Sequence, residues 1–296
     1  MSLKVGILMG GPSEERDVSL STGKAVAEAC KVNGFQTTEF PFHFDHRKLL
    51  DDLKKQDIIF NALHGGIGEN GKIQTWMNKN GIRFTGSGPA SSALCMDKEK
   101  SKTIVMNHNI STGKWEMLKS SEDFPTLSRP FVIKPNDQGS TVGLSIVRED
   151  SEIELAIKEG FEHGELLMVE DYIHGRELTV TILGEQAFPI VEIRPSHDLY
   201  DYECKYTPGM SQYICPAEIS ESITQSIQKD TEIIFKALGC AVYARADFLL
   251  DDNGNYFFLE MNTLPGMTST SLVPKSVNAA GMNFEELIKR IIELSL

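Results

Sequence analysis

The sequence predicts a protein of mixed α/β and α+β class, with a parallel α/β domain at the N-terminus. Two observations support this prediction. In residues 1–93, short apolar runs alternate with segments of helical periodicity, which is typical of a parallel sheet covered by helices. From residue 94 onwards, apolar runs follow one another across glycine-containing turns, which indicates antiparallel hairpins. A chain of 296 residues is long enough for two or three domains around a shared cleft.

The N-terminal domain begins with a buried strand over residues 3–9, followed by two glycines and a helix in SEERDVSLSTGKAVAEAC. A second strand, DIIFNAL at 57–63, ends in HGGIGENG, and GIRFTGSG at 81–88 is a third candidate. Open α/β sheets bind ligands at the carboxyl ends of their strands. Glu15 and His64 lie at such ends and are candidate site residues, although helix stabilisation and packing are alternatives.

Residues 94–182 predict a central antiparallel unit. DKEKSKTIVMNHN and SEIELAIKEGF have helical character. RPFVIKPNDQGSTVGLSIV indicates two strands joined by a glycine-containing loop, and LLMVEDYIHGRELTVTILG indicates two more strands around HGR.

Residues 183–296 predict a third unit. It begins with strand FPIVEIRP, continues through an irregular stretch over about 198–217, which is a candidate lid, and enters a helix near 220–238. YARADFLLDDNGNYFFLEMN then indicates a hairpin around Asn253-Gly254. The last helix places five apolar side chains on one face for core packing, namely Phe284, Leu287, Ile288, Ile291 and Ile292.

Charge and composition exclude several classes of function. The chain has 29 basic and 42 acidic residues, and its net charge of -13 disfavours binding to nucleic acid or to an anionic membrane. Five cysteines without a C-x-x-C pair fit neither a disulfide framework nor a zinc site. No apolar run approaches the roughly 20 residues that span a bilayer, and the N-terminus lacks the features of a signal peptide. We therefore expect a cytoplasmic protein.

The hairpin near the C-terminus carries the most informative pattern. If Asn253 and Gly254 form a two-residue loop, Asp247 faces Glu260 and Arg245 faces Asn262. Like charges directly opposite on a sheet are destabilising unless a cation lies between them, and Mg²⁺ or Mn²⁺ prefers carboxylate and amide oxygens. The alternative is a solvated face, and a three-residue loop would shift the register.

A basic residue and a small-residue loop occur together in KPNDQGSTVG at 134–143. Backbone amides in such a loop can approach phosphate oxygens, while Lys134 supplies a positive charge. The segment is not a P-loop, because G-x-x-x-x-G-K-[ST] is absent. A glycine-rich hairpin turn without a ligand is the alternative.

Taken together, the motifs resemble one family. GGPSEERDVSL, ALHGGIGENG, FTGSG, MDKEKSK, KPNDQGSTVG, YDYECKY, YARADF and LEMNTLPGMTSTSLVP occur in the order and spacing of the D-alanine:D-alanine ligases, within the ATP-grasp superfamily. The match runs from about residue 4 to residue 294. The resemblance implies a two-part ATP-grasp fold after the N-terminal domain. It also implies ATP-dependent ligation of two D-alanines through an acyl phosphate, for peptidoglycan precursor synthesis.

The resemblance also implies roles for individual residues. Residues expected to bind ATP are Lys98, Lys134, Glu170, Ile173, Glu177 and Lys205. Two Mg²⁺ or Mn²⁺ ions would be bound by Asp247, Glu260 and Asn262. Arg245 and the amide of Gly266 would stabilise the oxyanion. D-Alanine would contact Glu15, His64, Ser271 and Leu272, and Ser140 and Tyr206 would bond to Glu15 to close the lid.

Two departures from the family pattern bear on ATP binding. Thr141 replaces a common serine but keeps the hydroxyl, and Asp171 replaces a common lysine and reverses a charge near the adenine. Family members that form a D-lactate ester commonly carry phenylalanine at the position of Tyr206, so we expect a dipeptide product. The family also suggests a homodimer.

Three other functions remain as alternatives. The chain could be a ligase of the same superfamily for other amino acids, a non-catalytic ATP-binding regulator, or a nicotinamide oxidoreductase. The substrate motifs argue against the first, the retained polar hairpin residues against the second, and a missing third glycine against the third.

Overall fold

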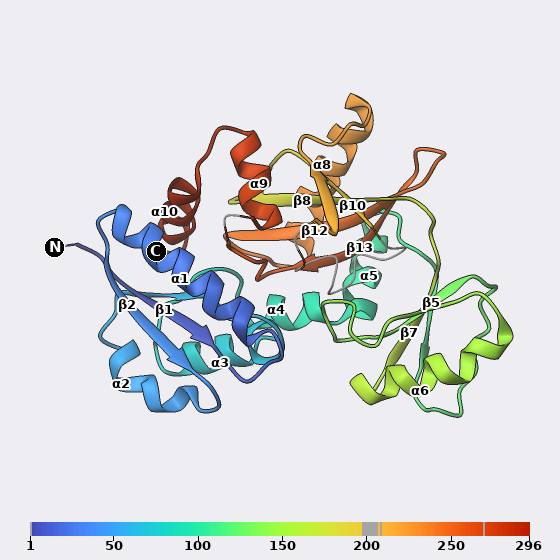
Figure 1. The fold of residues 1–296 in the computed structure, drawn as a ribbon, viewed down its shortest axis with the longest axis horizontal. Helices are drawn as coiled ribbons and strands as arrows, with labels where there is room; N and C mark the ends of the chain where they lie inside the picture. Colours follow the sequence, from blue (N-terminus) through green and yellow to red (C-terminus); the bar gives the residue numbers. More distant parts are fainter. Residues whose placement is uncertain (1, 197–206, 208, 269) are drawn as a thin grey trace.

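The computed structural model describes residues 2–196, 207, 209–268 and 270–296. The strands of these residues form three sheets, with helices covering and linking them (Figure 1). The first sheet is parallel and the other two are antiparallel. The predicted mixed α/β and α+β class is therefore confirmed.

The N-terminal sheet has the order β2-β1-β3, formed by β1 (Lys4–Gly10), β2 (Gln36–Phe42) and β3 (Ile58–Asn61). Its helices are α1 (Arg16–Val32), α2 (Leu50–Leu53) and α3 (Lys72–Lys79). Strand β2 was not predicted, because most of its side chains are exposed at the sheet edge and give no apolar run. The candidate strand at 81–88 forms only an isolated parallel bridge between Ile59 and Phe84.

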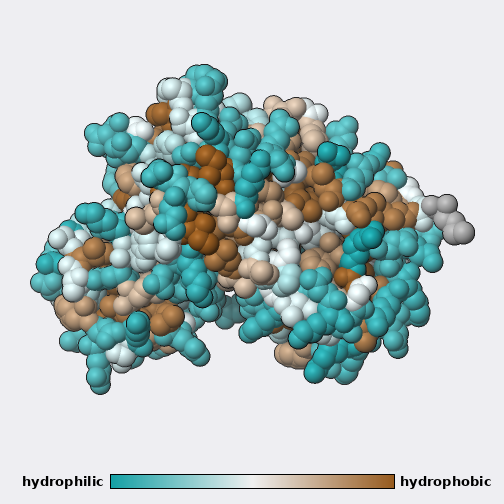
Figure 2. Space-filling model, turned by 180° about the vertical axis from the view of Figure 1, so that it is seen from behind, coloured by the Kyte–Doolittle hydropathy of each residue, from teal (hydrophilic) through white to brown (hydrophobic). Residues whose placement is uncertain are grey.

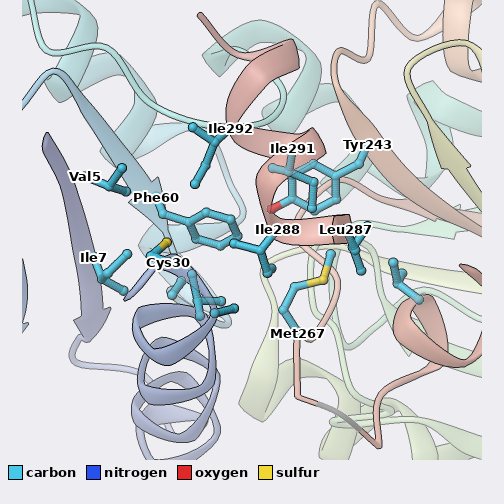
Figure 3. Packing of buried hydrophobic residues seen from close by; sticks show 14 of the residues in the cluster. Val5, Ile7, Cys30, Phe60, Tyr243, Met267, Leu287, Ile288, Ile291 and Ile292 are labelled. Carbon is cyan, nitrogen blue, oxygen red and sulfur yellow. The ribbon is translucent and has the colours of Figure 1, made fainter. Parts of the chain in front are cut away.

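The C-terminal helix packs on the N-terminal sheet. In α10 (Phe284–Leu294), the predicted apolar face is confirmed, with Phe284 partly buried and the other four side chains fully buried. Figure 3 shows the four fully buried side chains of α10 in one cluster with Val5, Ile7 and Phe60 from the first sheet. Burying each Leu or Ile stabilises the fold by roughly 1.5–3 kcal/mol. The last helix therefore joins the C-terminal part of the chain to the first domain.

The central sheet has the order β4-β7-β5-β6, formed by β4 (Trp115–Leu118), β5 (Phe131–Pro135), β6 (Ser145–Val147) and β7 (Leu167–Asp171). Helix α6 (Ile153–His163) packs against it with Ile153, Ala156 and Ile157. Helices α4 (Pro89–Met96) and α5 (Lys98–Asn107) precede this sheet. The Asp97 carboxylate accepts from the amide of Lys100 at 3.1 Å, which fixes the start of α5 at Lys98.

The third sheet has the order β11-β10-β8-β12-β13, with β9 (Gln186–Ala187) also pairing with β8. Its other strands are β8 (Arg176–Leu183), β10 (Val191–Pro195), β11 (Ser211–Ile214), β12 (Tyr243–Leu250) and β13 (Tyr256–Asn262). Helices α8 (Glu221–Ala237) and α9 (Leu272–Ala279) follow β11 and β13. β8 pairs with β12 along its whole length and so lies in the third sheet, whereas the predicted limit after residue 182 groups this strand with the central unit.

The hairpin between β12 and β13 has the predicted residue pairs, but for a different reason. Asp247 faces Glu260 and Arg245 faces Asn262, as predicted. However, the amide of Asp251 bonds to the carbonyl of Asn255 at 2.9 Å, so the loop contains three residues and not two. The strand pairing shifts between Asp247 and Phe248, where Leu259 is the extra residue of a β-bulge. The bulge cancels the shift introduced by the longer loop.

The predicted domain limits stay a prediction, and the sheets divide the chain somewhat differently. The limit after residue 93 falls inside α4, and the limit after residue 182 falls inside β8. Seen from behind, the molecule narrows to a notch between two lobes, and its surface is largely hydrophilic with hydrophobic areas near the middle (Figure 2). In the described part of the chain, every helix is too short or too polar to cross a membrane.

Candidate active site

Two adjoining cavities lie where the N-terminal, central and third sheets meet. The larger has a volume of about 380 Å³ and the smaller of about 130 Å³. They share six lining residues, namely Lys98, Gln138, Gly139, Ser140, Arg245 and Glu260. A concave site with convergent charged groups is the expected form of a ligand pocket.

One end of the larger cavity joins the N-terminal domain to the loop after β5. The hydroxyl of Ser140 donates to Glu15 Oε1 at 2.8 Å, as the resemblance implied. Glu15 is the N-cap residue of α1. Ser140 and Thr141 have φ values of 53° and 64°, a left-handed conformation that is costly for non-glycine residues and is frequent at functional sites.

His64 is buried beside the same carboxylate. Its Nε2 lies 3.0 Å from the hydroxyl of Thr22. Burial lowers the pKa of His64 to about 4, so the imidazole is neutral at physiological pH. Gly65 has φ of 65° and ψ of 169°, a backbone conformation that residues with a side chain rarely adopt, which explains the glycine next to this histidine.

Gly266 and Ser271 also lie close to His64. A Cβ at Gly266 would lie 3.1 Å from Ser271 Oγ and 3.9 Å from His64 Cε1. Leu272, the first residue of α9, lines the same cavity. The four predicted D-alanine residues are therefore gathered around one cavity, although they come from distant parts of the chain.

Glu69 is a site residue that the sequence analysis did not assign. It lines the larger cavity, accepts from the amide of Gly65 at 2.9 Å, and lies 3.9 Å from His64 Nδ1. Burial, together with the negative charge of Glu15, raises the pKa of Glu69 to about 7. Its position at the end of HGGIGE, after a parallel strand, was the available signal.

Lys98 lies at the boundary between the two cavities. Its Nζ donates to the carbonyl of Gln138 at 2.6 Å and is 3.6 Å from Glu260 Oε2. The side chain is buried, and burial lowers the pKa of Lys98 despite the opposing attraction of Glu260. This lysine can therefore contact a ligand in either cavity.

A buried ion network lies behind the smaller cavity. Lys134 Nζ donates to Glu170 Oε2 at 2.5 Å, and Lys102 Nζ donates to Glu170 Oε1 at 2.5 Å. Lys102 also donates to the hydroxyl of Thr112 at 2.5 Å and to the carbonyl of Phe258 at 3.1 Å. Burial alone would raise the pKa of Glu170, but the two lysines outweigh it and lower the pKa. Glu170 thus fixes the position of Lys134.

The polar face of the hairpin is held by charge-assisted bonds. Arg245 donates to both carboxylate oxygens of Asp247, at 2.9 and 2.7 Å, and Thr179 donates to Asp247 at 2.6 Å. Asn262 Oδ1 accepts from the amide of Leu264 at 2.8 Å. Asp247 lines the smaller cavity, Asn262 the larger, and Glu260 both. The oxygen-rich set suits a hard divalent cation.

The other predicted ATP residues have different positions. Glu177 lines the smaller cavity, whereas Ile173 is half-buried and does not line either of these two cavities. Lys205, Tyr206 and half of the candidate lid, residues 198–206 and 208, lie outside the described residues. The described end of the predicted irregular stretch contains β11, which pairs with β10.

Two further supporting residues were missed by sequence reasoning. Lys102 follows Lys98 by four residues, one helical turn later, and this spacing was a usable signal. Thr179 gave no signal, because its contact with Asp247 depends on the long-range pairing of β8 with β12.

The fold and the site define a class of protein. A glycine-containing hairpin loop and a carboxylate-bearing hairpin, carried by two antiparallel sheets, face a shared cleft beside an N-terminal α/β domain. This is the architecture of ATP-grasp ligases, and the comparisons with known proteins agree.

The chain belongs to the D-alanine–D-alanine ligase family. The family model described as D-ala D-ala ligase C-terminus matches residues 103–293. The chain is 42% identical over 305 aligned positions to a D-alanine–D-alanine ligase of Halalkalibacterium halodurans, covering 99% of both proteins.

Solved structures agree with this assignment. The D-alanine–D-alanine ligase of Bacillus anthracis complexed with ATP is 33% identical, with a TM-score of 0.88 over 99% of this chain and 97% of that one. VanG D-Ala:D-Ser ligase of Enterococcus faecalis is 30% identical, with a TM-score of 0.86 over the whole of both chains.

Proposed function

We propose that the protein joins two D-alanine molecules to D-alanyl-D-alanine, with ATP as co-substrate and ADP and phosphate as products. The observation that carries this proposal is the junction of the two cavities. Lys98, Ser140, Arg245 and Glu260 line both, so a nucleotide phosphate in one adjoins an amino acid in the other. Family membership gives the substrate pair.

The first step activates a carboxylate. A carboxylate is a poor electrophile, because oxide is a poor leaving group, and transfer of the ATP γ-phosphoryl group gives an acyl phosphate. Lys98 and Lys134 would neutralise charge on the phosphate oxygens, a largely electrostatic contribution. Their amines are already positioned by Gln138 and Glu170.

The first D-alanine would bind at the N-terminal end of the larger cavity. Glu15 would accept its ammonium group, and the neutral His64 would orient its carboxylate. The second D-alanine would lie near Ser271 and Leu272. Its amine would attack the acyl phosphate, and phosphate would leave.

Arg245 and the backbone amide of Gly266 would stabilise the oxyanion formed in that attack. Both residues line the larger cavity. Asp247 holds the guanidinium through two hydrogen bonds, so Arg245 would need little reorganisation during the reaction.

Two Mg²⁺ or Mn²⁺ ions would be bound by Asp247, Glu260 and Asn262. Among the described residues, no group of three or more His, Cys, Asp or Glu side chains converges on one point. The protein would thus supply two carboxylates and one amide, and phosphate oxygens would complete the coordination. When bound, such ions neutralise charge on the transferred phosphoryl group.

The experiment that tests this function measures phosphate release from ATP with D-alanine, L-alanine, D-lactate, D-serine or no addition, and identifies the products. We expect release and dipeptide formation with D-alanine alone. Release that is equal without an amino acid would indicate an ATPase. A preferred product other than D-alanyl-D-alanine would assign another acceptor.

We also propose that the protein acts as a cytoplasmic homodimer. The family suggests the dimer, and the net charge of -13 disfavours nucleic acid and anionic membranes as partners. Sedimentation equilibrium of the purified chain tests the dimer, and a monomer at all concentrations would exclude it.

A further inference from the structure

Two thiols meet at the wall of the larger cavity. Cys95 in α4 and Cys240, shortly before β12, are separated by 145 residues, yet their sulfur atoms lie 3.6 Å apart. Cys95 is buried and lines the cavity, whereas Cys240 is only partly buried. The proposed ligase reaction uses neither thiol.

Hydrogen bonds fix the surroundings of this pair. The hydroxyl of Ser91 donates to Cys240 Sγ at 3.4 Å. Ser87 accepts from the amide of Ala241 at 3.0 Å and donates to its carbonyl at 3.3 Å. Because the backbone of Ala241 is tied to Ser87, and Ser91, one helical turn before Cys95, bonds to Cys240, the two thiols are kept close together. A disulfide needs a sulfur separation of about 2.05 Å, so the two sulfur atoms must approach each other before the bond can close.

The two thiols differ in their environment. Hydrogen bonding by Cys95 and by Ser91 lowers the pKa of Cys240, whereas the bond to Cys240 and burial raise the pKa of Cys95. The thiolate is the nucleophile in thiol–disulfide exchange, so the more exposed Cys240 is suited to react first. The other two described cysteines are less suited to react. Burial raises the pKa of the Cys30 thiol to about 12 and that of the Cys215 thiol to about 11, so their thiolate forms are scarce.

We propose that Cys95 and Cys240 are an oxidation site that closes to a disulfide and lowers turnover. The Cys240 thiolate attacks a low-molecular-weight disulfide, forms a mixed disulfide and releases one thiolate. The Cys95 thiol then attacks Cys240 Sγ and loses its proton, and the second small thiol leaves. The protein thiols are oxidised by two electrons, and the small disulfide is reduced to two thiols.

The bridge would join two segments that lie close in sequence to site residues. Helix α4 ends two residues before Lys98, and Arg245 lies in β12, five residues after Cys240. Fixing α4 to the segment before β12 should limit adjustment of the cavity during each turnover. This consequence rests on the proposed function, whereas formation of the disulfide does not.

The site can be mapped directly with oxidised glutathione as the oxidant. The intact protein is treated, blocked with iodoacetamide and digested with trypsin. Cys95 lies in peptide 84–98 and Cys240 in peptide 237–245, whereas the other three cysteines lie in peptides 25–31, 177–205 and 206–229. We expect a linked 84–98/237–245 species that dithiothreitol separates. Linkage among the other peptides only, or no linkage, would overturn the site.

Two variants test the order of reaction. In Cys95→Ser, the resolving thiol is absent, so glutathione should accumulate on peptide 237–245. In Cys240→Ser, peptide 84–98 should remain unmodified, because Cys95 is buried. Glutathione on Cys95 in the second variant would reverse the assigned order. Cys215→Ser is the matched control and should still form the linked species.

The rate of phosphate release tests whether the disulfide lowers turnover. Oxidised wild-type protein should lose severalfold in the rate of phosphate release with D-alanine and recover it with dithiothreitol. Cys240→Ser, treated identically, should keep its rate. A fully linked protein with unchanged turnover would overturn the effect on catalysis, and lack of ligase activity before oxidation would overturn the proposed function alone.

Discussion

Ser140 and Glu15 are joined by a 2.8 Å hydrogen bond that spans 125 residues of sequence. The bond connects the loop after β5, which lines both cavities, to the first turn of α1 in the N-terminal domain. It holds the carboxylate that we expect to accept the ammonium of the first D-alanine. The loop that faces the phosphates and the amino-acid end of the site are therefore linked directly.

We expect Ser140→Ala to raise the KM for D-alanine more than the KM for ATP. A hydrogen bond to a charged group contributes about 1.5–3 kcal/mol, which corresponds to roughly a 10- to 100-fold change. Steady-state phosphate release measures both constants. Ser151→Ala, at an exposed position, is the control and should leave both unchanged. Equal increases in the two KM values would indicate that Ser140 only shapes the loop.

Glu260→Gln should abolish most ATP turnover while the fold survives. The substitution keeps the size of the side chain but removes a negative oxygen donor at the wall of both cavities. Circular dichroism checks the fold, and phosphate release is measured across a Mg²⁺ titration. Asp252→Asn, on the exposed loop of the same hairpin, should behave as wild type. Undiminished turnover at saturating Mg²⁺ would remove Glu260 from the metal ligands.

His64 and Glu69 should give opposite pH dependences of stability. Burial lowers the pKa of His64 from 6.5 to about 4, so the unfolded chain binds a proton first as the pH falls through this window, and unfolding becomes easier. Burial raises the pKa of Glu69 from 4.5 to about 7, so the folded chain binds a proton first, and acid favours folding. Each effect is of the order of 3 kcal/mol across its whole window. In the wild-type protein the two largely cancel.

Single variants separate the two contributions. Relative to wild type, the unfolding free energy of His64→Asn should rise as the pH falls from 7 to 4.5, since Glu69 remains. That of Glu69→Gln should fall as the pH falls from 6.5 to 4, since His64 remains. Urea unfolding at several pH values measures both slopes, with exposed His43→Asn as the control. Parallel slopes in the two variants would contradict these protonation states.

The hairpin shows how far local sequence rules extend. The facing pairs at Asp247 and Arg245 were predicted from a two-residue loop, yet the loop has three residues and Leu259 bulges from the partner strand. Glycine at position 254, with φ of 84°, explains the longer loop. No comparable local signal marks the bulge. The predicted pairs are correct because two errors of one residue cancel.

Local sequence rules could not predict contacts between distant segments. Periodicity identified β8 as a strand and α10 as an amphipathic helix, but it does not state which sheet each one joins. That choice depends on the packing of whole elements, and it places β8 beside β12 and α10 on the N-terminal sheet. Most of the residues that the family resemblance implied, in contrast, line one or both cavities, because motifs retain the order of such residues even where the pairing is not evident.

Lys102 gives a final prediction about the ATP end of the site. It is fully buried, and its ammonium group contacts one oxygen of Glu170 while Lys134 contacts the other. Removing one partner of a buried ion pair costs about 3–5 kcal/mol. Lys102→Met should therefore lower the free energy of unfolding. Glu170 would be less well fixed, and Lys134 would be misplaced, so the KM for ATP should rise more than the KM for D-alanine.

Lys100→Met is the matched control, because Lys100 is an exposed lysine on the same helix and pairs with Asp97 at the surface. It should change neither stability nor kinetics appreciably, because exposed ion pairs contribute little. If Lys102→Met folds too poorly to assay, Thr112→Val removes only one hydroxyl partner of the same ammonium group and should give a smaller shift in the same direction. A loss of stability in either variant with an unaltered ratio of the two KM values would mean that Lys102 supports the core and does not position Lys134. A selective rise in the KM for ATP, with Lys100→Met unchanged, is what the shared carboxylate of Glu170 leads us to expect.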